Sequence, residues 1–143
     1  MKLETNVPQL RKPTKEVDRD EDISEIVANL FEGLKEYHAL GLSANELGYN
    51  KRIFVMRMNA YPPICVVNPI IAKKRGSQLV EETCLSLPGV TVKVKRPYQI
   101  VIKGENRYRK PVKYRLRGQQ ARIACHELDH LWGKLITDYK QEE

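Results

Sequence analysis

Apolar residues recur at helical spacing in one N-terminal segment. The residues that follow each other at these intervals are Ile23, Ile26, Val27, Leu30, Phe31 and Leu34. The spacing places them on one face of an α-helix, and we expect an amphipathic helix over residues 22–38 with that face in the core. Its first residues, Asp22-Ile23-Ser24-Glu25, resemble a capping box. The polar residues 1–20, interrupted by Pro8 and Pro13, predict an irregular lead-in.

Short apolar or alternating runs predict a series of strands after this helix. They lie at residues 52–56, 64–67, 90–94, 98–103 and 108–116. The second strand is expected to end at Asn68-Pro69, and Gly104-Glu105-Asn106 is expected to form the hairpin turn between the last two. Residues 39–48 are rich in small side chains and, taken alone, predict a tightly packed turn.

A second helix is expected from about Gln119 to Gly133, with Ile123, Leu128 and Leu131 in the core. Helices combined with antiparallel strands indicate an α+β fold. A chain of 143 residues is long enough for one core, and we expect a single domain over residues 1–143.

Composition narrows the class of protein. Hydrophobic residues make up 41% and charged residues 30%, as in soluble globular domains. No signal peptide and no apolar run of transmembrane length is recognisable, so we expect the cytosol and no membrane contact. The formal charge of +7 favours a polyanionic partner. The basic residues are scattered along the sequence, however, which predicts a solvated surface rather than nucleic-acid binding as the main function.

The candidate chemistry lies in the last predicted helix, at His126-Glu127-Leu128-Asp129-His130. Four residues separate His126 from His130, so in a helix both imidazoles can reach one cation. Glu127 stands where a carboxylate can take a proton from a water held by that cation. The alternative is an exposed helix with two ordinary histidines, because this short motif also arises by chance.

A catalytic metal site needs a third ligand, which a cysteine or a carboxylate can supply. The spacing of Cys65, Cys84 and Cys125 does not indicate a disulfide framework. Cys125 points about 100° away from His126 around the helix, and Cys65 lies in an apolar strand. Cys84 lies in a turn with polar neighbours, where the backbone can place a thiolate, and we favour it as the ligand.

Three segments together resemble the motifs of the peptide deformylase family. Glu82-Thr83-Cys84-Leu85-Ser86 resembles E-G-C-L-S, residues 126–133 resemble H-E-x-D-H-L-x-G, and residues 41–46 resemble G-h-G-h-A-A-x-Q. Their order and spacing match those of the family, and the resemblance extends over about residues 7–139. It implies antiparallel strands packed around a central metal-binding helix.

The resemblance implies hydrolysis of the N-formyl group of formyl-methionyl nascent peptides. One cation, usually Fe²⁺ and alternatively Zn²⁺, Ni²⁺ or Co²⁺, would be held by Cys84, His126 and His130, with the fourth position left for water. That water would attack the formyl carbon while Glu127 takes its proton and passes it to the leaving amine. The backbone N–H of Leu85 would donate to the developing oxyanion. Asp129 would orient a ligand or the helix, unless it is an ordinary exposed carboxylate.

The substrate's methionine requires an apolar pocket. By family position Leu40, Val80 and Ile123 would line it together with the His126 ring, although such residues serve equally well in a core. Gly41 would let the extended peptide pair with the backbone as an added strand.

Two substitutions depart from the family pattern. Thr83 replaces a glycine, adding a Cβ that narrows the cleft or requires a shifted turn. Glu46 replaces a glutamine whose amide donates to the oxyanion, and an ionised carboxylate can only accept. Either Glu46 is protonated in the complex, or the oxyanion relies on Leu85 and the cation, or the protein is a slow deformylase. We expect Glu46→Gln to raise kcat/KM at neutral pH.

The chain ends soon after the metal-binding helix, whereas many bacterial relatives continue into a C-terminal helix used for ribosome docking. We expect a short form without that helix, from a trimmed genome, viral or organellar, acting as a monomer in the cytosol, an organellar matrix or a host cytosol. Its positive charge would give weak, salt-sensitive attraction to ribosomal RNA. Two other functions remain open: a small peptidase with the same H-E-x-x-H motif, and a non-enzymatic metal or nucleic-acid binding protein that kept the fold after Glu46 weakened catalysis.

Overall fold

The computed structural model describes residues 2–139. The helices are α1 (Val7–Leu10), α2 (Ser24–Glu36) and α3 (Gln119–Leu131), with 3-10 turns η1 (Ala44–Leu47) and η2 (Ile136–Asp138). The strands are β1 (Gly41–Ser43), β2 (Ile53–Met56), β3 (Ile64–Arg75), β4 (Gln78–Cys84), β5 (Leu87–Arg96), β6 (Gln99–Glu105) and β7 (Pro111–Arg117). The predicted combination of helices with antiparallel strands is confirmed.

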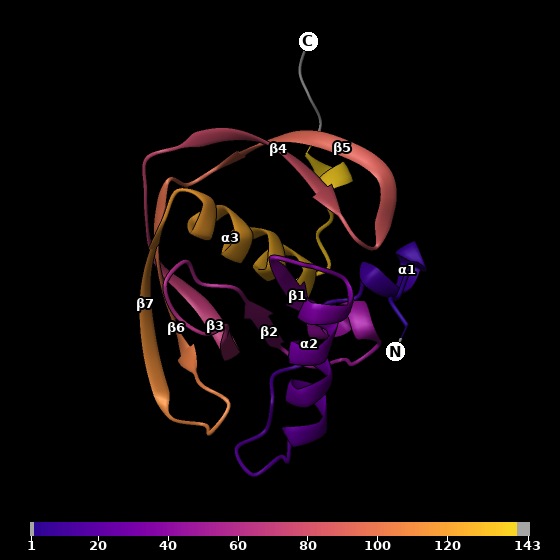
Figure 1. The fold of residues 1–143 in the computed structure, drawn as a ribbon, viewed down its shortest axis with the longest axis vertical. Coiled ribbons are helices and arrows are strands. Elements are labelled where there is room, and N and C mark those ends of the chain that lie inside the picture. Colours follow the sequence, from indigo (N-terminus) through magenta and orange to yellow (C-terminus); the bar gives the residue numbers. More distant parts are fainter. Residues whose placement is uncertain (1, 140–143) are drawn as a thin grey trace.

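The strands form two sheets. Five are ordered β1-β2-β3-β6-β7 with every neighbouring pair antiparallel, and β4 pairs with β5 in a separate hairpin. Helix α3 contacts β1, β2 and β7 of the large sheet and β5 of the hairpin. Figure 1 shows the β4–β5 hairpin passing over α3, with β3, β6 and β7 at the left.

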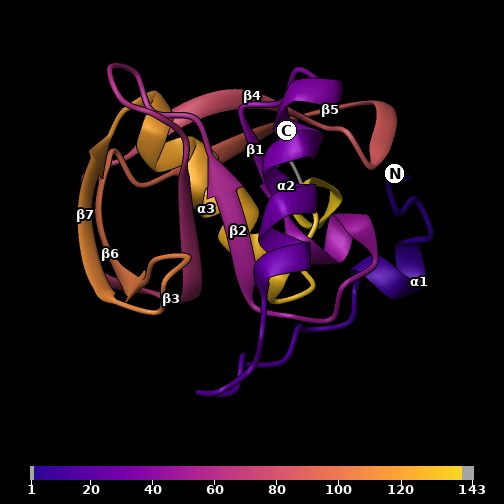
Figure 2. The same ribbon diagram turned by 60° about the horizontal axis from the view of Figure 1, so that its bottom comes forward.

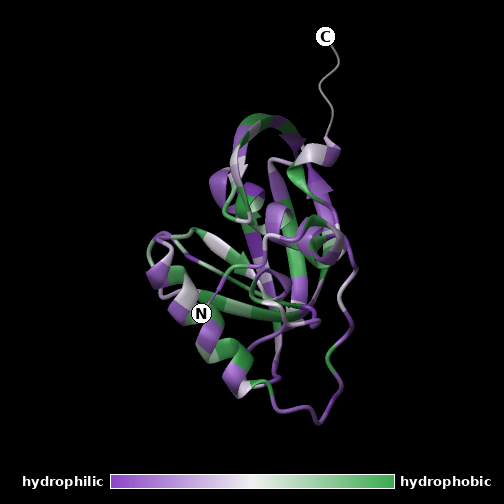
Figure 3. Ribbon diagram, turned by 90° about the vertical axis from the view of Figure 1, so that its right-hand side faces the viewer, coloured by the Kyte–Doolittle hydropathy of each residue, from purple (hydrophilic) through white to green (hydrophobic). Residues whose placement is uncertain are grey.

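Strand β2 separates two hydrophobic clusters. Ile53 and Val55 belong to a cluster with α2, whereas Phe54 and Met56 belong to a cluster with α3. Because alternate side chains of a strand project to opposite faces, this explains why all of β2 is buried and why its sequence is continuously apolar. Figure 2 shows β2 running between α2 and α3, and Figure 3 shows hydrophobic and hydrophilic segments alternating along the helices.

The two predicted helices are confirmed with small shifts at their ends. Ile123, Leu128 and Leu131 of α3 are buried as expected. The predicted capping box of α2 is wrong, because the N-cap is Ile23, which makes no side-chain cap bond. Asp22 instead accepts hydrogen bonds from the backbone and hydroxyl of Ser24 at 3.0 and 2.7 Å, since a short carboxylate reaches the N–H two residues ahead.

Three local predictions need correction. The lead-in contains the short helix α1, in which Asn6 accepts a bond from the Gln9 N–H. Residues 41–47 form β1 and η1 rather than a simple turn. Strand β3 continues through Asn68-Pro69, because Asn68 adopts a positive φ of 51° and the register shifts between Val67 and Ile70. Such an irregularity accommodates a proline, which has no N–H for the ladder.

The predicted hairpin turn at Gly104-Glu105-Asn106 is also displaced. Gly104 and Glu105 pair with β7, and the turn follows at residues 106–110, where the Asn106 side chain accepts from the Tyr108 and Lys110 N–H groups. Gly104 is required by packing, because a Cβ there would lie 2.8 Å from the Val67 carbonyl oxygen. Within residues 2–139, no helix is long and apolar enough to span a bilayer.

Candidate metal centre

Three potential metal ligands converge between β4 and α3. Cys84 is the last residue of β4, and His126 and His130 lie on successive turns of α3. One ligand atom from each lies within 4.8 Å of the others. The Cys84 Sγ is 3.4 Å from His130 Nε2, and the two imidazole centroids are 4.7 Å apart. All three side chains are buried.

The three cysteines differ in their electrostatic surroundings. Burial raises the pKa of Cys65 to about 12 and that of Cys125 to about 11. Burial also raises the pKa of Cys84, but hydrogen bonds with His126 and His130 outweigh it and lower the pKa below the usual value. Because the thiolate is the form that binds a metal, Cys84 is the cysteine suited to be a ligand.

This donor set fits a divalent transition-metal ion. One thiolate and two imidazoles suit Fe²⁺ or Zn²⁺, and three protein ligands are typical of catalytic rather than structural sites. Glu127 Oε1 is buried without a hydrogen-bond partner among residues 2–139. Unpaired buried polar atoms are rare in native interiors and call for an explanation such as a bound ion or a catalytic role.

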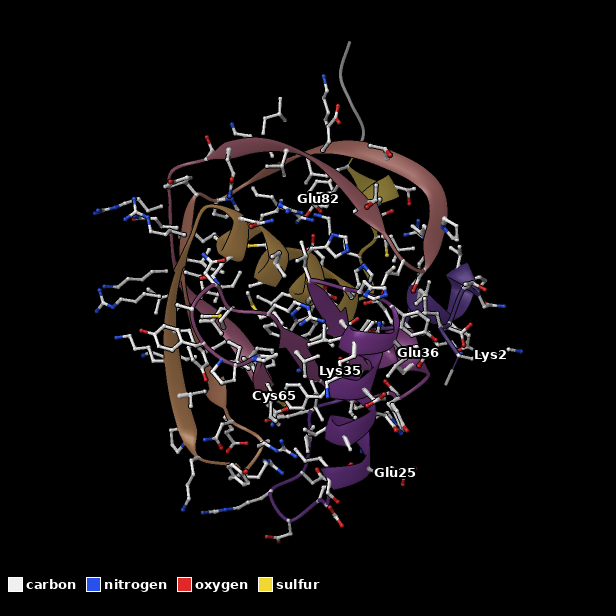
Figure 4. All side chains as sticks on the ribbon, viewed as in Figure 1. Lys2, Glu25, Lys35, Glu36, Cys65 and Glu82 are labelled. Atoms are coloured by element: carbon white, nitrogen blue, oxygen red, sulfur yellow. The ribbon has the colours of Figure 1, made fainter. Side chains whose placement is uncertain are left out.

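A buried carboxylate orients His126. Glu82 Oε1 lies 2.7 Å from His126 Nδ1, so Nε2 remains for a cation, as is common for metal-binding histidines. Figure 4 shows Glu82 between the β4–β5 hairpin and α3. Burial raises the pKa of Glu82, but its bonds with Arg96 and His126 outweigh this and lower the pKa to about 2. Glu82 is therefore ionised at neutral pH.

Arg96 holds this carboxylate in place. Its Nε and Nη2 donate to the two oxygens of Glu82 at 2.8 and 2.7 Å, and its Nη1 donates to Asp129. The Tyr139 hydroxyl donates to Asp129 as well. Among residues 2–139, the Asp129 side chain forms no hydrogen bond with Cys84, His126 or His130, and its connection to His126 passes through Arg96 and Glu82. Sequence reasoning missed Arg96, although its place in β5, two residues after the buried Val94, indicates an inward-facing side chain.

Glu46 lies next to His130 and is almost fully buried. Its Oε1 accepts bonds from the Ser43 N–H and hydroxyl at 3.1 and 3.0 Å, and its Oε2 accepts from the Ser86 hydroxyl at 3.0 Å. Its Oε1 is 3.4 Å from His130 Nδ1. Burial raises the pKa of Glu46, but the charge of His130 outweighs it and holds the pKa below the ordinary value. Both carboxylate oxygens therefore act as acceptors.

The pKa of Glu127 is shifted in the opposite direction to that of Glu46. Burial raises its pKa, and the neighbouring charge of Glu46 raises it further. One ligand atom each of Glu46, Glu127 and His130 lie within 4.8 Å of one another. A raised pKa suits a carboxyl group that takes up and returns a proton near neutral pH.

A cavity of about 440 Å³ opens beside these residues. Of the residues predicted to contact substrate, Leu40, Gly41, Thr83 and Ile123 line it, whereas Val80 on β4 does not. The other predicted site residues that line it are Glu46, Cys84, Leu85, His126 and Glu127. Thr83 lies in β4 opposite Thr91 and has no positive φ, so the backbone accepts a side chain there.

Sequence reasoning missed four residues of the cavity wall, namely His38, Ala39, Pro88 and Arg122. Arg122 precedes His126 by four residues, and this spacing on a helix is the signal that predicts a shared face. His38 adopts a positive φ of 50° just before β1, and we find no sequence signal for it. Gly41 meets α3 so closely that a Cβ would lie 2.8 Å from Glu127 Oε2.

Comparisons of sequence and of structure with known proteins both find peptide deformylases. A family model described as polypeptide deformylase matches residues 3–143. The peptide deformylase of Dictyoglomus thermophilum is 39% identical over 95% of this chain and 89% of its own, and that of Chlorobium luteolum is 38% identical over 91% and 70%. Among solved structures, peptide deformylase from Thermotoga maritima is similar with a TM-score of 0.91 at 33% identity, covering 99% of this chain and 97% of its own. The PDF of Vibrio parahaemolyticus bacteriophage VP16T, solved with actinonin, has a TM-score of 0.89 at 34% identity, covering 95% and 100%.

Proposed function

The chain belongs to the polypeptide deformylase family, metal-dependent hydrolases that remove the formyl group from nascent peptides, and we propose which residues carry out this reaction. Cys84, His126 and His130 are the proposed metal ligands, and Glu127 is the proposed general base and acid. The observation that carries this assignment is the convergence of ligand atoms from Cys84, His126 and His130. Two of these residues, Cys84 and His126, line one cavity together with Glu127.

Fe²⁺ is the cation that we propose, and Zn²⁺, Ni²⁺ and Co²⁺ suit the same thiolate and imidazoles. When bound, the cation supplies a Lewis acid that lowers the pKa of a coordinated water. The arrangement of both sheets about α3 supports the assignment, because α3 brings two ligands and Glu127 to the strand end that carries Cys84.

The chain's own groups move the proton and bind the developing charge. We propose that Glu127 accepts a proton from the attacking water and returns it to the departing amine, which its raised pKa and unpaired Oε1 support. The backbone N–H of Leu85 is the proposed donor to the formyl oxygen as negative charge develops there. Glu46 accepts on both oxygens, so we assign it a positioning role toward Ser43, Ser86 and His130.

We propose that the substrate binds as an extended peptide along β1. This strand is at the edge of the large sheet and, in the part of the chain that the structure describes, pairs with β2 alone, so its other edge can accept an added strand. Gly41 lies where that edge meets the cavity. Leu40, Ile123 and the His126 ring offer apolar surface for the methionine side chain, and Thr83 borders the same space.

The test is an anaerobic preparation loaded with Fe²⁺ and assayed on formyl-Met-Ala-Ser. Release of formate is expected, and Met-Ala-Ser without the formyl group should not be cleaved at its peptide bonds. Glu127→Gln should bind the cation yet lose turnover, whereas Cys84→Ala should lose the cation. Cleavage of the unformylated peptide would indicate a peptidase, and a loaded protein without turnover would indicate a binding protein.

Other aspects of the function follow as proposals. We expect residues 1–143 to act as one catalytic domain and as a monomer, in the cytosol or an equivalent compartment where nascent formylated peptides occur. Analytical ultracentrifugation of the full chain tests the oligomeric state.

A further inference from the structure

One face of the large sheet collects cationic side chains from three strands. In the register, Lys73 and Arg115 both stand opposite Val101, and Arg75 and Arg117 both stand opposite Gln99. Lys103 stands opposite Lys113 in the next row. Residues opposite each other in a ladder project from the same face. The basic face consists of Lys73, Arg75, Lys103, Lys113, Arg115 and Arg117, all of them exposed.

The opposite face of these strands is buried at Ile100, Ile102 and Leu116. Ile100, Ile102 and Leu116, which alternate with the cationic positions, belong to the cluster that contains α3. The basic face is therefore the outer surface of the sheet. Figure 4 shows long nitrogen-tipped side chains projecting outward at the left, on the side where β3, β6 and β7 lie.

The charge of the basic face is not neutralised within the part of the chain that the structure describes. None of its six residues forms an ion pair there. Glu105, the acidic residue at the far end of β6, is paired with Arg109. The six charges compare with a formal net charge of +7 for the chain, so the rest of the molecule is close to neutral. The expectation that basic residues are scattered holds for the sequence, whereas the register places six of the 25 basic residues on one face.

The basic face is hollowed as well as charged. Lys73, Arg75, Arg115 and Arg117 line a groove of about 560 Å³, together with Gln99 and Val101 between them and with Lys74, Ile100 and Leu116 of the alternate positions. Along β7, alternate residues are roughly 7 Å apart, a spacing that suits successive phosphates of an extended nucleic-acid strand. The arginines can bind phosphate oxygens through two parallel hydrogen bonds.

We propose that the basic face binds the sugar-phosphate backbone of RNA. A hollowed, twisted sheet fits a single strand better than a flat bilayer, and peripheral membrane binding usually relies on an amphipathic helix with an apolar face. The choice of RNA also rests on the proposed function, because a nascent peptide is presented by a ribosome. The cavity is lined from β1, β4 and α3, so bound RNA would leave it open.

The test uses the full chain and a fluorescein-labelled 20-nucleotide polyuridine, followed by fluorescence anisotropy between 50 and 200 mM KCl. A triple variant, Lys73→Gln with Lys103→Gln and Arg115→Gln, removes three charges from the basic face. The matched control, Lys12→Gln with Arg19→Gln and Lys35→Gln, removes three exposed charges elsewhere; Lys35 is seen on α2 in Figure 4. Circular dichroism melting verifies that both variants fold.

The basic-face variant should bind the RNA at least tenfold more weakly, and its slope of log affinity against log salt should fall by about 2, since each lost contact with single strands contributes about 0.7. The control should lose less than twofold. Equal losses in both variants would overturn the proposal, because net charge alone would explain them. Binding that depends on the basic face to vesicles with 30% phosphatidylserine, but not to RNA, would overturn it in favour of a membrane. Turnover of formyl-Met-Ala-Ser, measured on the same samples, tests the proposed function separately and should be equal in both variants.

Discussion

Glu46 is the residue at which this chain departs most from the motif that it otherwise matches. Its two oxygens accept bonds from Ser43 and Ser86, and Oε1 also lies 3.4 Å from His130 Nδ1. A glutamine of the same shape can keep its carbonyl toward the Ser43 N–H and place its amide group toward Ser86, whose hydroxyl can act as acceptor. The exchange would therefore add a donor to the cavity wall without changing the volume of the site.

We predict that Glu46→Gln raises kcat/KM on formyl-Met-Ala-Ser at neutral pH, by up to about 10²-fold, the cost of losing one oxyanion donor. The same change removes a carboxylate next to His130, and such partners affect metal affinity about 10–100-fold. The kinetics must therefore be measured at saturating metal, and affinity separately by competition with a chelator. Unchanged or lower activity at every pH would show that the carboxylate itself is used.

Arg122 brings a positive charge to the cavity that we propose binds the substrate. Because it lies on the same face of α3 as His126, a residue of the peptide beyond the methionine can approach it. We predict that the enzyme prefers an acidic residue after the formyl-methionine, and that Arg122→Gln abolishes this preference, measured as the ratio of kcat/KM for formyl-Met-Asp-Ser and formyl-Met-Ala-Ser. A ratio that stays the same in the variant would exclude Arg122 as its cause.

At the level of elements, Arg96 connects β5 to β4 and α3 through Glu82 and Asp129. Arg96→Leu leaves Glu82 as a buried charge without its main partner, and we predict a loss of about 3–5 kcal/mol in the free energy of unfolding. Arg117→Leu makes the same exchange on the exposed face of β7 and should change stability by less than about 0.5 kcal/mol. Urea denaturation measures both.

The double variant Glu82→Gln with Arg96→Leu distinguishes a stranded charge from lost packing. Removing both charges should cost less than removing Arg96 alone, because the buried carboxylate is then gone. A double variant that is less stable than Arg96→Leu would show that packing of the arginine, rather than its charge, stabilises the hairpin against α3.

The elements that sequence reasoning placed well are those with a long periodic signal. The stripe from Ile23 to Leu34 and the run from Ile123 to Leu131 repeat over several turns, and both helices form there. The end of β3 and the turn after β6 were misplaced because a proline and a glycine are tolerated in strands where the register shifts or another backbone approaches. Neither condition is visible in the local sequence.

Some residues of the candidate site could be predicted from the sequence, and others could not. Cys84, His126, Glu127 and His130 lie in short motifs with a chemical rationale, and the structure brings them together. Arg96 is separated from Asp129 by most of β6, β7 and α3, so its role depends on tertiary contacts that spacing does not reveal. The basic face likewise depends on the register between strands.

At the scale of the whole molecule, metal binding should stabilise the fold, because Cys84 and the histidines come from elements that unfolding separates. We predict that Zn²⁺ at about 100 times its dissociation constant adds about 2.7 kcal/mol of stability, seen as a higher melting temperature that EDTA reverses. Cys84→Ala should lose this shift, whereas Cys125→Ala, a similar change in a cysteine outside the ligand group, should keep it. An equal shift in both variants would place the cation elsewhere.

Strand β2 contributes alternate side chains to both hydrophobic clusters. Unfolding of either cluster, the one with α2 or the one with α3, would therefore expose apolar side chains of β2 to solvent. The two clusters should consequently melt as one cooperative unit, and the amide hydrogens of β2 should exchange with deuterium only through global opening. Native-state hydrogen exchange tests this: amides of Phe54 and Val55 should be among the slowest, with opening energies equal to the global free energy of unfolding. Faster exchange there than in α2 would indicate that the two clusters unfold independently.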